Sequence, residues 1–279
     1  MTMVSEKMVS NVFGLKVDTI AFLKEWGWID QSVEELAAGV NRFLDKCGFS
    51  SDPPEKLYRY RSPRHMVDEI ANHYVHYSPV TSMNDPYDCL FSSRRTYKKI
   101  GMLDDDSDEF FDDEFEKMAS DSIREGIDVC CFGTDCTSFS MWDQYADGHK
   151  GVCIEYDTRK LLKHNVKPRK VKYSVRSFKR FNEQANDIAE YLVGHLSGCT
   201  LTKNRAYAHE REWRSFGTGA SNVRIEDAIN CVYIGSRCSK GRNKVIQACR
   251  DLGIDYVKMT VPDDEYSFIQ HRHPANRNL

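Results

Sequence analysis

The stretch that most restricts the fold is residues 140–157, SMWDQYADGHKGVCIEYD. Its first half places Met141, Trp142 and Tyr145 at the i, i+1, i+4 spacing of one helical stripe. Gly148 then favours a helix end, and the alternating VCIEYD that follows is typical of a strand. The sequence therefore predicts a helix joined to a strand by a short polar turn, a place where binding and catalytic residues are often carried.

Strands and helices are interleaved irregularly along the rest of the chain, and no internal repeat is evident. Apolar and polar patterns predict strands over 57–61, 74–78, 127–133, 152–157, 209–217, 230–235 and 255–260. Helices are predicted over 62–72, 140–147, 178–196 and 240–252, with a short one capped by Asp157. This order predicts an α+β fold with a mixed, curved sheet flanked by helices.

Residues 1–50 are predicted to form a small helical N-terminal extension. Ser32 and Glu35 have the spacing of a capping box for its second helix. The composition of residues 50–55, SSDPPE, is that of a linker to the main domain, residues 56–279. We expect the extension to dock on the main domain or on a protein partner.

The composition is that of an ordinary globular protein, with 41% hydrophobic and 29% charged residues and a net charge of −3. This charge argues against a protein that coats nucleic acid generally, but it leaves room for a local basic site. No apolar run approaches the roughly 20 residues of a membrane span. The N-terminus lacks the apolar core of a signal peptide, so we expect a cytoplasmic protein without a membrane partner.

The ten cysteines form no C-x-x-C motif, and most stand singly inside apolar segments. They are expected to be buried thiols, and no metal site is predicted. His271 and His273 could pair with a cysteine, but the tail HRHPANRNL is predicted to be a mobile terminus.

Two predicted strands carry like charges on one face. Arg59 and Arg61 share a face of LYRYR, and Glu210 and Glu212 share a face of HEREWRSFG. A buried sheet face disfavours unpaired charges, so each pair requires a polar cleft or, on an edge strand, solvent. The sequence holds no phosphate-binding glycine loop, HExxH, GxSxG or Rossmann fingerprint. The charged strand faces are therefore the main candidates for a functional site.

Four segments resemble, in order, the landmarks of an uncharacterised bacterial domain family of unknown function. They are LYRYR at 57–61, YSPVTSMNDPYD at 77–88, CFGTDCTSFSMWDQYADGHKGVCIEYD at 131–157 and EREWR at 210–214. The resemblance covers about residues 57–260, and the long middle segment is the most specific. The family carries no known activity, so this resemblance implies kinship and leaves the function open.

A second resemblance suggests chemistry. An arginine on an early strand, a serine on the next and Glu-x-Glu on a late strand are similar to the R-S-E layout of ADP-ribosyltransferases. The resemblance implies a split sheet of that type and NAD as the substrate. Arg59 or Arg61 would hold the NAD phosphate or ribose, and Ser78 would support the nicotinamide pocket. Glu212 would grip the ribose 2′-hydroxyl, while Glu210 would orient the acceptor nucleophile.

Four more residues complete the predicted site. Tyr145, Asn84 and Asp85 are candidate NAD-binding residues, and His149 at the helix-to-strand turn is expected to contact phosphate or the acceptor. Cleavage of the nicotinamide–ribose bond develops positive charge on the sugar, which a nearby carboxylate stabilises. A guanidinium binds pyrophosphate in a bidentate manner. The resemblance thus implies an enzyme that modifies a nucleic acid or protein, as bacterial toxins and phage-defence effectors do.

Two other functions stay open. A metal-dependent nuclease or phosphodiesterase would draw on Asp85, Asp88, Asp147, His149, Glu155 and Glu210 for ligands and a base. Asp85 is equally well explained as a turn residue that accepts from backbone amides. A non-catalytic binding module would use the acidic predicted helix 104–116 or the basic stretch 167–181. In that basic stretch aromatic residues alternate with Lys and Arg, a pattern that suits RNA or DNA.

Overall fold

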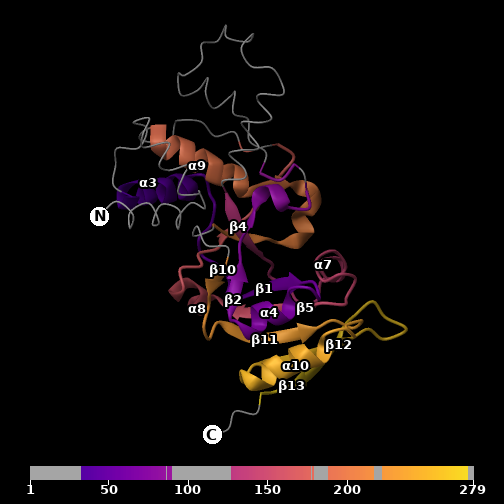
Figure 1. The fold of residues 1–279 in the computed structure, drawn as a ribbon. Helices are drawn as coiled ribbons and strands as arrows, with labels where there is room; N and C mark the ends of the chain where they lie inside the picture. The colour runs from indigo at the N-terminus through magenta and orange to yellow at the C-terminus, as the bar shows by residue number, and fades with distance from the viewer. Residues whose placement is uncertain are drawn as a thin grey trace.

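The computed structural model describes residues 33–85, 87–89, 127–176, 178, 188–216 and 222–275. These residues form a mixed α+β fold with several sheets, which confirms the predicted class (Figure 1). Ser32 of the predicted capping box and the predicted acidic helix 104–116 lie outside the described residues. Over the described ranges, no helix combines the length and apolar character needed to cross a bilayer.

The larger sheet has five strands in the order β1-β5-β11-β12-β13. They are β1 (Lys56–Arg61), β5 (Val152–Asp157), β11 (Ile229–Ile234), β12 (Asp255–Thr260) and β13 (Ile269–His273). β11 and β12 run parallel and are connected through α10 (Arg242–Asp251), whereas the other neighbours are antiparallel. The sheet is therefore mixed, and α10 lies against β12 (Figure 1).

The second sheet has four antiparallel strands in the order β3-β4-β9-β6. They are β3 (Ser78–Pro79), β4 (Asp128–Phe132), β9 (Trp213–Phe216) and β6 (Arg169–Lys170). An isolated bridge between Tyr58 and Gly133 joins β1 to the residue after β4. Two backbone hydrogen bonds of 2.9 and 2.7 Å close this bridge. Away from the bridge, β1 and β4 belong to different sheets.

Two strand pairs and several helices complete the fold. The pairs are β2 (Tyr74–His76) with β10 (Asn222–Arg224), and β7 (Lys172–Ser174) with β8 (Thr202–Asn204). The α-helices are α3 (Val33–Lys46), α4 (Met66–Ala71), α7 (Phe139–Tyr145), α8 (Thr158–Lys163) and α9 (Ile188–Thr200). The 3-10 helices are η1 (Val80–Ser82) and η3 (Arg205–Glu210). Asp157 caps α8 as predicted, whereas α9 ends later than predicted.

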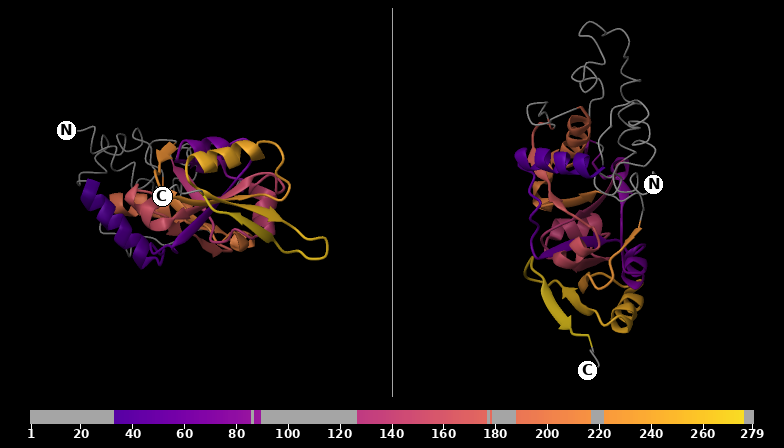
Figure 2. Two further views of the ribbon diagram at one scale, coloured as in Figure 1. Left: turned by 90° about the horizontal axis from the view of Figure 1, so that it is seen from below. Right: turned by 90° about the vertical axis from the view of Figure 1, so that its left-hand side faces the viewer.

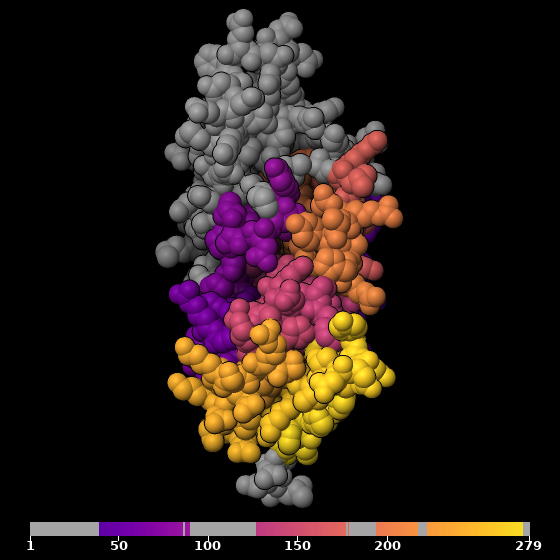
Figure 3. All heavy atoms as spheres, turned by 90° about the vertical axis from the view of Figure 1, so that its right-hand side faces the viewer, coloured from indigo at the N-terminus to yellow at the C-terminus, as the bar shows by residue number. Residues whose placement is uncertain are grey.

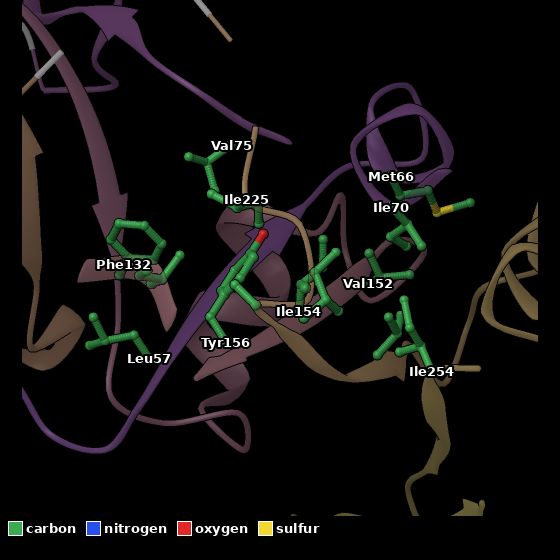
Figure 4. Packing of buried hydrophobic residues seen from close by; sticks show 14 of the residues in the cluster. Leu57, Met66, Ile70, Val75, Phe132, Val152, Ile154, Tyr156, Ile225 and Ile254 are labelled. Atoms are coloured by element: carbon green, nitrogen blue, oxygen red, sulfur yellow. The ribbon is translucent and has the colours of Figure 1, made fainter. Parts of the chain in front are cut away.

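The main core lies on one face of the larger sheet (Figure 4). Val152, Ile154 and Tyr156 of β5 are fully buried in it, which agrees with their predicted alternation. α4 has six residues, too few for a stable isolated helix, and it is held by the burial of Met66 and Ile70. Each such side chain contributes about 1.5–3 kcal/mol when fully buried. Packing rather than helix propensity therefore fixes α4 beside β1.

The predicted helix-to-strand junction is present. α7 ends at Tyr145, and Asp147, Gly148 and His149 follow in the left-handed region with φ of 51°, 61° and 67°. Trp142 anchors the helix because its ring is fully buried and its Nε1 donates to the Cys136 carbonyl oxygen at 2.8 Å. The compact turn brings the chain directly into β5.

The predicted strand over 209–217 is wrong in its first half. Residues 205–210 form η3, Arg211 adopts the left-handed conformation with φ of 47°, and β9 begins only at Trp213. The Asn204 side chain accepts from the backbone N–H of Ala206 at 2.9 Å and so caps η3. Glu210 and Glu212 therefore do not share a face of one strand.

The prediction of a mobile C-terminal tail is wrong for His271 and His273, which lie on β13 and pair with β12. His273 stacks on Tyr256 with ring centroids 4.8 Å apart. The loop between β12 and β13 projects from the sheet (Figure 2), and Phe268 at its end stacks on Phe139 of α7 at 4.4 Å. Strand pairing and ring stacking thus hold a segment whose composition suggested a free end.

The part of the predicted N-terminal extension that the structure describes packs on the main domain. α3 contacts α9, and its residue Phe43 is fully buried. The Arg169 guanidinium of β6 donates to the Asp45 side chain at 2.8 Å, to the Asn41 side chain at 2.7 Å and to the Phe49 carbonyl oxygen at 2.9 Å. The domain boundary at residue 50 stays a prediction.

Deletion of residues 1–50 tests this boundary. We expect a folded remainder whose melting temperature falls by more than about 5 °C, because α9 loses buried aromatic contacts and Arg169 loses its partners. A deletion of residues 1–32 keeps those contacts and serves as the control in the same calorimetric scan. Loss of the cooperative transition in the longer deletion alone would make α3 part of the core.

A second prediction concerns the approach of β5 to β1. A Cβ atom on Gly151 would lie 2.0 Å from the Arg61 carbonyl oxygen, whereas one on Gly133 would meet nothing closer than 3.5 Å. Gly151→Ala is therefore expected to destabilise the fold by about 1–3 kcal/mol or more in urea unfolding, since the obstructing atom is backbone. Gly133→Ala, the matched control, is expected to cost far less. Equal stabilities for the two variants would contradict this packing.

Candidate functional site

A cavity of about 160 Å³ is lined by residues from both sheets, where β1 and β4 separate beyond the Tyr58–Gly133 bridge. Its lining includes Tyr58, Arg59, Tyr60 and Arg61 of β1, Ser78 and Asn84 after β2, Cys131 of β4, Met141 and Tyr145 of α7, and Lys203, Glu210 and Glu212. In the space-filling view, residues around 130–150 lie between the segment around 200–216 and the β12–β13 hairpin (Figure 3).

The cavity gathers most of the residues singled out in the sequence. Arg59, Arg61, Ser78, Asn84, Tyr145, Glu210 and Glu212 line it. His149 and Asp85 are not among its lining residues. The strands and helices that supply these side chains are far apart in sequence, so their meeting is a property of the fold.

The two arginines are buried to different degrees and are only partly paired. Arg59 is 8% exposed, and its Nη2 donates to the His76 carbonyl oxygen at 2.7 Å. Arg61 forms an ion pair with buried Glu69 at 2.5 Å. Burial and the charge of Arg59 lower the pKa of Arg61. Nη1 of Arg59 and Nε of Arg61 are buried and have no hydrogen-bond partner among the described residues.

Glu212 belongs to a buried ion pair. Nε and Nη2 of Arg214 donate to its two carboxylate oxygens at 3.0 and 2.9 Å. Arg214 is fully buried and also donates to both oxygens of Asp88, at 2.8 and 2.6 Å. Burial raises the pKa of Glu212, but the charges of Arg214 and Lys203 outweigh it and lower that pKa to about 2. Glu212 is therefore ionised at physiological pH.

Glu210 is held by a different pair of groups. Lys203 Nζ donates to its Oε2 at 2.6 Å, and the Tyr145 hydroxyl donates to its Oε1 at 2.9 Å. Lys203 Nζ also lies 3.4 Å from Glu212 Oε2. Sequence reasoning missed Lys203 because β8 has three residues, too few to show which face a side chain occupies.

Tyrosine rings form part of the cavity wall. The hydroxyl of Tyr58 donates to Glu155 at 3.3 Å, and that of Tyr60 donates to the Asp135 carbonyl oxygen at 2.7 Å. The Tyr60 ring packs edge-on against Trp142 with centroids 5.3 Å apart. These contacts hold the two rings in place beside the cavity.

His149 lies among aromatic rings outside the cavity lining. Its ring is 6.2 Å from Trp142, 5.5 Å from Phe139 and 5.8 Å from Phe268, measured between centroids. Burial lowers its pKa, which favours the neutral ring. Asp85 accepts from the backbone N–H of Tyr87 at 2.9 Å, as a turn residue does. The predicted contacts of His149 and Asp85 with a ligand in this cavity are therefore not supported by their positions.

The acids and the histidine proposed for a metal site do not all converge: Asp88 and Glu210 both pair with Lys203, but the others lie elsewhere. Glu155 accepts from Tyr233 at 2.8 Å and pairs with Lys56, whereas Asp147 is exposed and pairs with Lys150. Asp88 pairs with Arg214 as described above. Among the described residues, no three His, Cys, Asp or Glu side chains are arranged to hold a metal ion. All ten cysteines are described, and no disulfide joins any two of them.

The basic stretch 167–181 is partly structural. Arg169 is buried against the segment that ends α3, and Lys172 Nζ donates to the Cys47 carbonyl oxygen at 2.6 Å. The Tyr173 hydroxyl accepts from the backbone N–H of Glu212 at 2.8 Å. Lys170 and Arg176 are exposed. Only part of this stretch is thus available to a partner.

The buried carboxylate generates a prediction about acid stability. The pKa of Glu212 is about 2 in the folded protein and 4.5 ordinarily, so its ionisation stabilises the fold above pH 4.5 and is lost as pH falls toward 2. This shift corresponds to roughly 3 kcal/mol. We expect Glu212→Gln to be less stable than the wild type at pH 7 and the difference to shrink as pH falls toward 3.

Urea unfolding at a series of pH values measures this difference. Glu226→Gln, at an exposed acid paired with Arg224, is the matched control and is expected to leave the stability nearly unchanged at every pH. A Glu212→Gln penalty that is constant between pH 7 and pH 3 would show that the carboxylate charge contributes little.

Comparisons with known proteins match part of the chain to a family that has no known activity. No curated protein matches the chain, and no solved structure matches it. Residues 141–215 match a family model described as "Protein of unknown function (DUF2971)". This segment runs from α7 through β9 and contains five of the residues that line the cavity: Met141, Tyr145, Lys203, Glu210 and Glu212. The predicted resemblance to an uncharacterised domain family is therefore confirmed over residues 141–215, which match DUF2971.

Proposed function

We propose that the protein is an ADP-ribosyltransferase-like enzyme that takes NAD as its substrate and modifies a macromolecule. The observation that carries this proposal is the meeting of Arg59, Arg61, Ser78, Glu210 and Glu212 in one cavity. The order of these residues along the chain suggested the reaction, and their common location is what the reaction requires. A metal-dependent nuclease is less favoured because its candidate ligands are dispersed.

The arginines supply the anion contacts. NAD carries a pyrophosphate, and a guanidinium with free N–H donors binds phosphate oxygens with short, charge-assisted hydrogen bonds. Arg59 and Arg61 each retain a buried N–H without a partner among the described residues. Both arginines line the cavity, and burial together with the charge of Arg59 lowers the pKa of Arg61, so an anion bound beside them would offset the repulsion between the two charges. Ser78 and Asn84 add neutral hydrogen-bonding groups to the same lining.

The acids suit the charge that develops in the reaction. As the bond between ribose C1′ and the nicotinamide nitrogen breaks, the electron pair leaves with nicotinamide and the sugar becomes cationic. Glu212 is ionised at neutral pH and would accept from the ribose 2′-hydroxyl near that charge. Glu210 would orient the acceptor nucleophile, which forms the new bond to C1′ and loses its proton.

The size of the cavity matches one part of the substrate. An engineered cavity of about 150 Å³ is known to hold one benzene molecule. A cavity of about 160 Å³ with tyrosine walls would therefore enclose one ring, such as nicotinamide, while the rest of the dinucleotide lies toward the opening. Exposed Lys170 and Arg176 of the basic stretch would meet the phosphates of a nucleic-acid acceptor.

The primary test is release of nicotinamide from NAD by the purified full chain, with and without RNA, DNA or protein acceptors. We expect release well above the spontaneous rate, and transfer of label from adenine-labelled NAD to the acceptor. No release with any acceptor, together with no NAD binding by calorimetry, would overturn the proposal.

A variant sharpens this test. Glu212→Gln is expected to lower turnover by about two to three orders of magnitude, the usual scale for losing one preorganised electrostatic group. NAD affinity should change much less, because the charge matters chiefly when the sugar becomes cationic. The assay is run below the unfolding temperature of the variant, with Glu226→Gln as the control for a remote acid. Full activity in folded Glu212→Gln would remove this residue from the reaction.

A further inference from the structure

Lys203 occupies a position in the site that the proposed reaction does not explain. Its Nζ lies 2.6 Å from Glu210, 3.4 Å from Glu212 and 3.6 Å from Asp88. The side chain is 5% exposed, and its Nζ also lies 4.9 Å from the centre of the Tyr207 ring. A lysine is almost never buried this deeply unless nearby anions compensate its charge.

The two glutamates depend on Lys203 to different extents. Glu212 has a second cation, Arg214, which contacts both of its oxygens. Among the described residues, Glu210 forms its ion pair with Lys203 alone, and its other oxygen accepts from the neutral hydroxyl of Tyr145. Removal of Lys203 would therefore leave Glu210 far less compensated than Glu212, and the two acids would repel each other without a cation between them.

We propose that Lys203 is a positioning residue that holds Glu210 and Glu212 side by side at the cavity by pairing with both carboxylates. This inference rests on the proposed function, since it assigns Lys203 a part in the same reaction through the two acids. Lys203 itself need not touch the substrate. Without its charge, Glu212 would bind a proton at a higher pH, because Lys203 is one of the two cations that lower its pKa.

Other groups around the pair also influence its titration. Arg214, Tyr145, Tyr173 and Cys131 contact the two acids, whereas Asp88 and Tyr207 contact Lys203. The Tyr145 hydroxyl is neutral because burial raises its pKa well above the ordinary range. Burial likewise raises the pKa of the Cys131 thiol. Near neutral pH the remaining charges are therefore those of Asp88 and Arg214, which already pair with each other.

The test follows the carboxylates directly by carbon-13 NMR of glutamate-labelled full-length protein, with Glu210→Gln and Glu212→Gln used for assignment. In Lys203→Met, the apparent pKa of Glu212 should rise by about 1 to 3. Lys203→Arg keeps the charge and should restore titration close to that of the wild type. Lys244→Met, at an exposed lysine of α10, is the matched control and should not alter the pair.

Turnover gives a second, separable readout. The acid limb of the pH profile of nicotinamide release should move upward in Lys203→Met by the same amount as the carboxylate titration. Unchanged carboxylate titration in folded Lys203→Met would overturn the inference whatever the activity. A shifted titration in a protein that never cleaves NAD would support the effect of Lys203 on the acids and overturn the proposed function.

A double variant covers the case in which Lys203→Met does not fold. Lys203→Met with Glu210→Gln removes one positive and one negative charge from the same buried contact. If the lysine acts by compensating Glu210, this pair of changes should restore folding and most of the wild-type melting temperature. A double variant as unstable as the single one would overturn the inference.

Discussion

Five buried charged groups hold together the segments that carry the two glutamates of the cavity. Asp88, Lys203, Glu210, Glu212 and Arg214 form a continuous set of ion pairs, and each of them is buried. Loss of one member of such a set costs several kcal/mol because its partners stay buried without compensation. The set therefore fixes the positions of the two glutamates more firmly than the surrounding loops could.

The division of the β structure into two sheets gives these charges a place to meet. The Tyr58–Gly133 bridge holds β1 and the end of β4 together, and the strands then enter different sheets. Where the two sheets separate, β1 and β4 no longer bond to each other. Side chains from both sheets therefore line the space between them. Arg59 and Arg61 approach this gap from one sheet, and Cys131 from the other. The polar cavity is thus a consequence of strand topology, since a continuous sheet would have closed it.

The sequence predicted the parts of the fold that depend on local periodicity. α7, β5 and β1 could be predicted because their apolar spacing and turn residues act within a few positions of the chain. The same alternation predicted that Arg59 and Arg61 share one face of β1. Lys203 and Asp88 were not recognised as partners of the acids, because an ion pair between distant segments leaves no periodic signal. The segment before β9 was misread because a side-chain cap at Asn204 favoured η3 over the strand that the alternation indicated. His149 was misplaced because a turn residue can face either a cavity or a ring cluster, and only tertiary packing decides between them.

The loop that joins β12 to β13 is anchored unevenly. Phe268 packs on Phe139 of α7, the same helix that carries Tyr145 to Glu210, whereas Tyr266 is 97% exposed two positions earlier. Insertions or deletions at Tyr266 would disturb no packing of its side chain, because that side chain is exposed. Changes at Phe268 would disturb a helix that reaches the cavity. Evolution is thus free to lengthen, shorten or decorate the projecting tip of this hairpin, provided that the anchor at its base is kept.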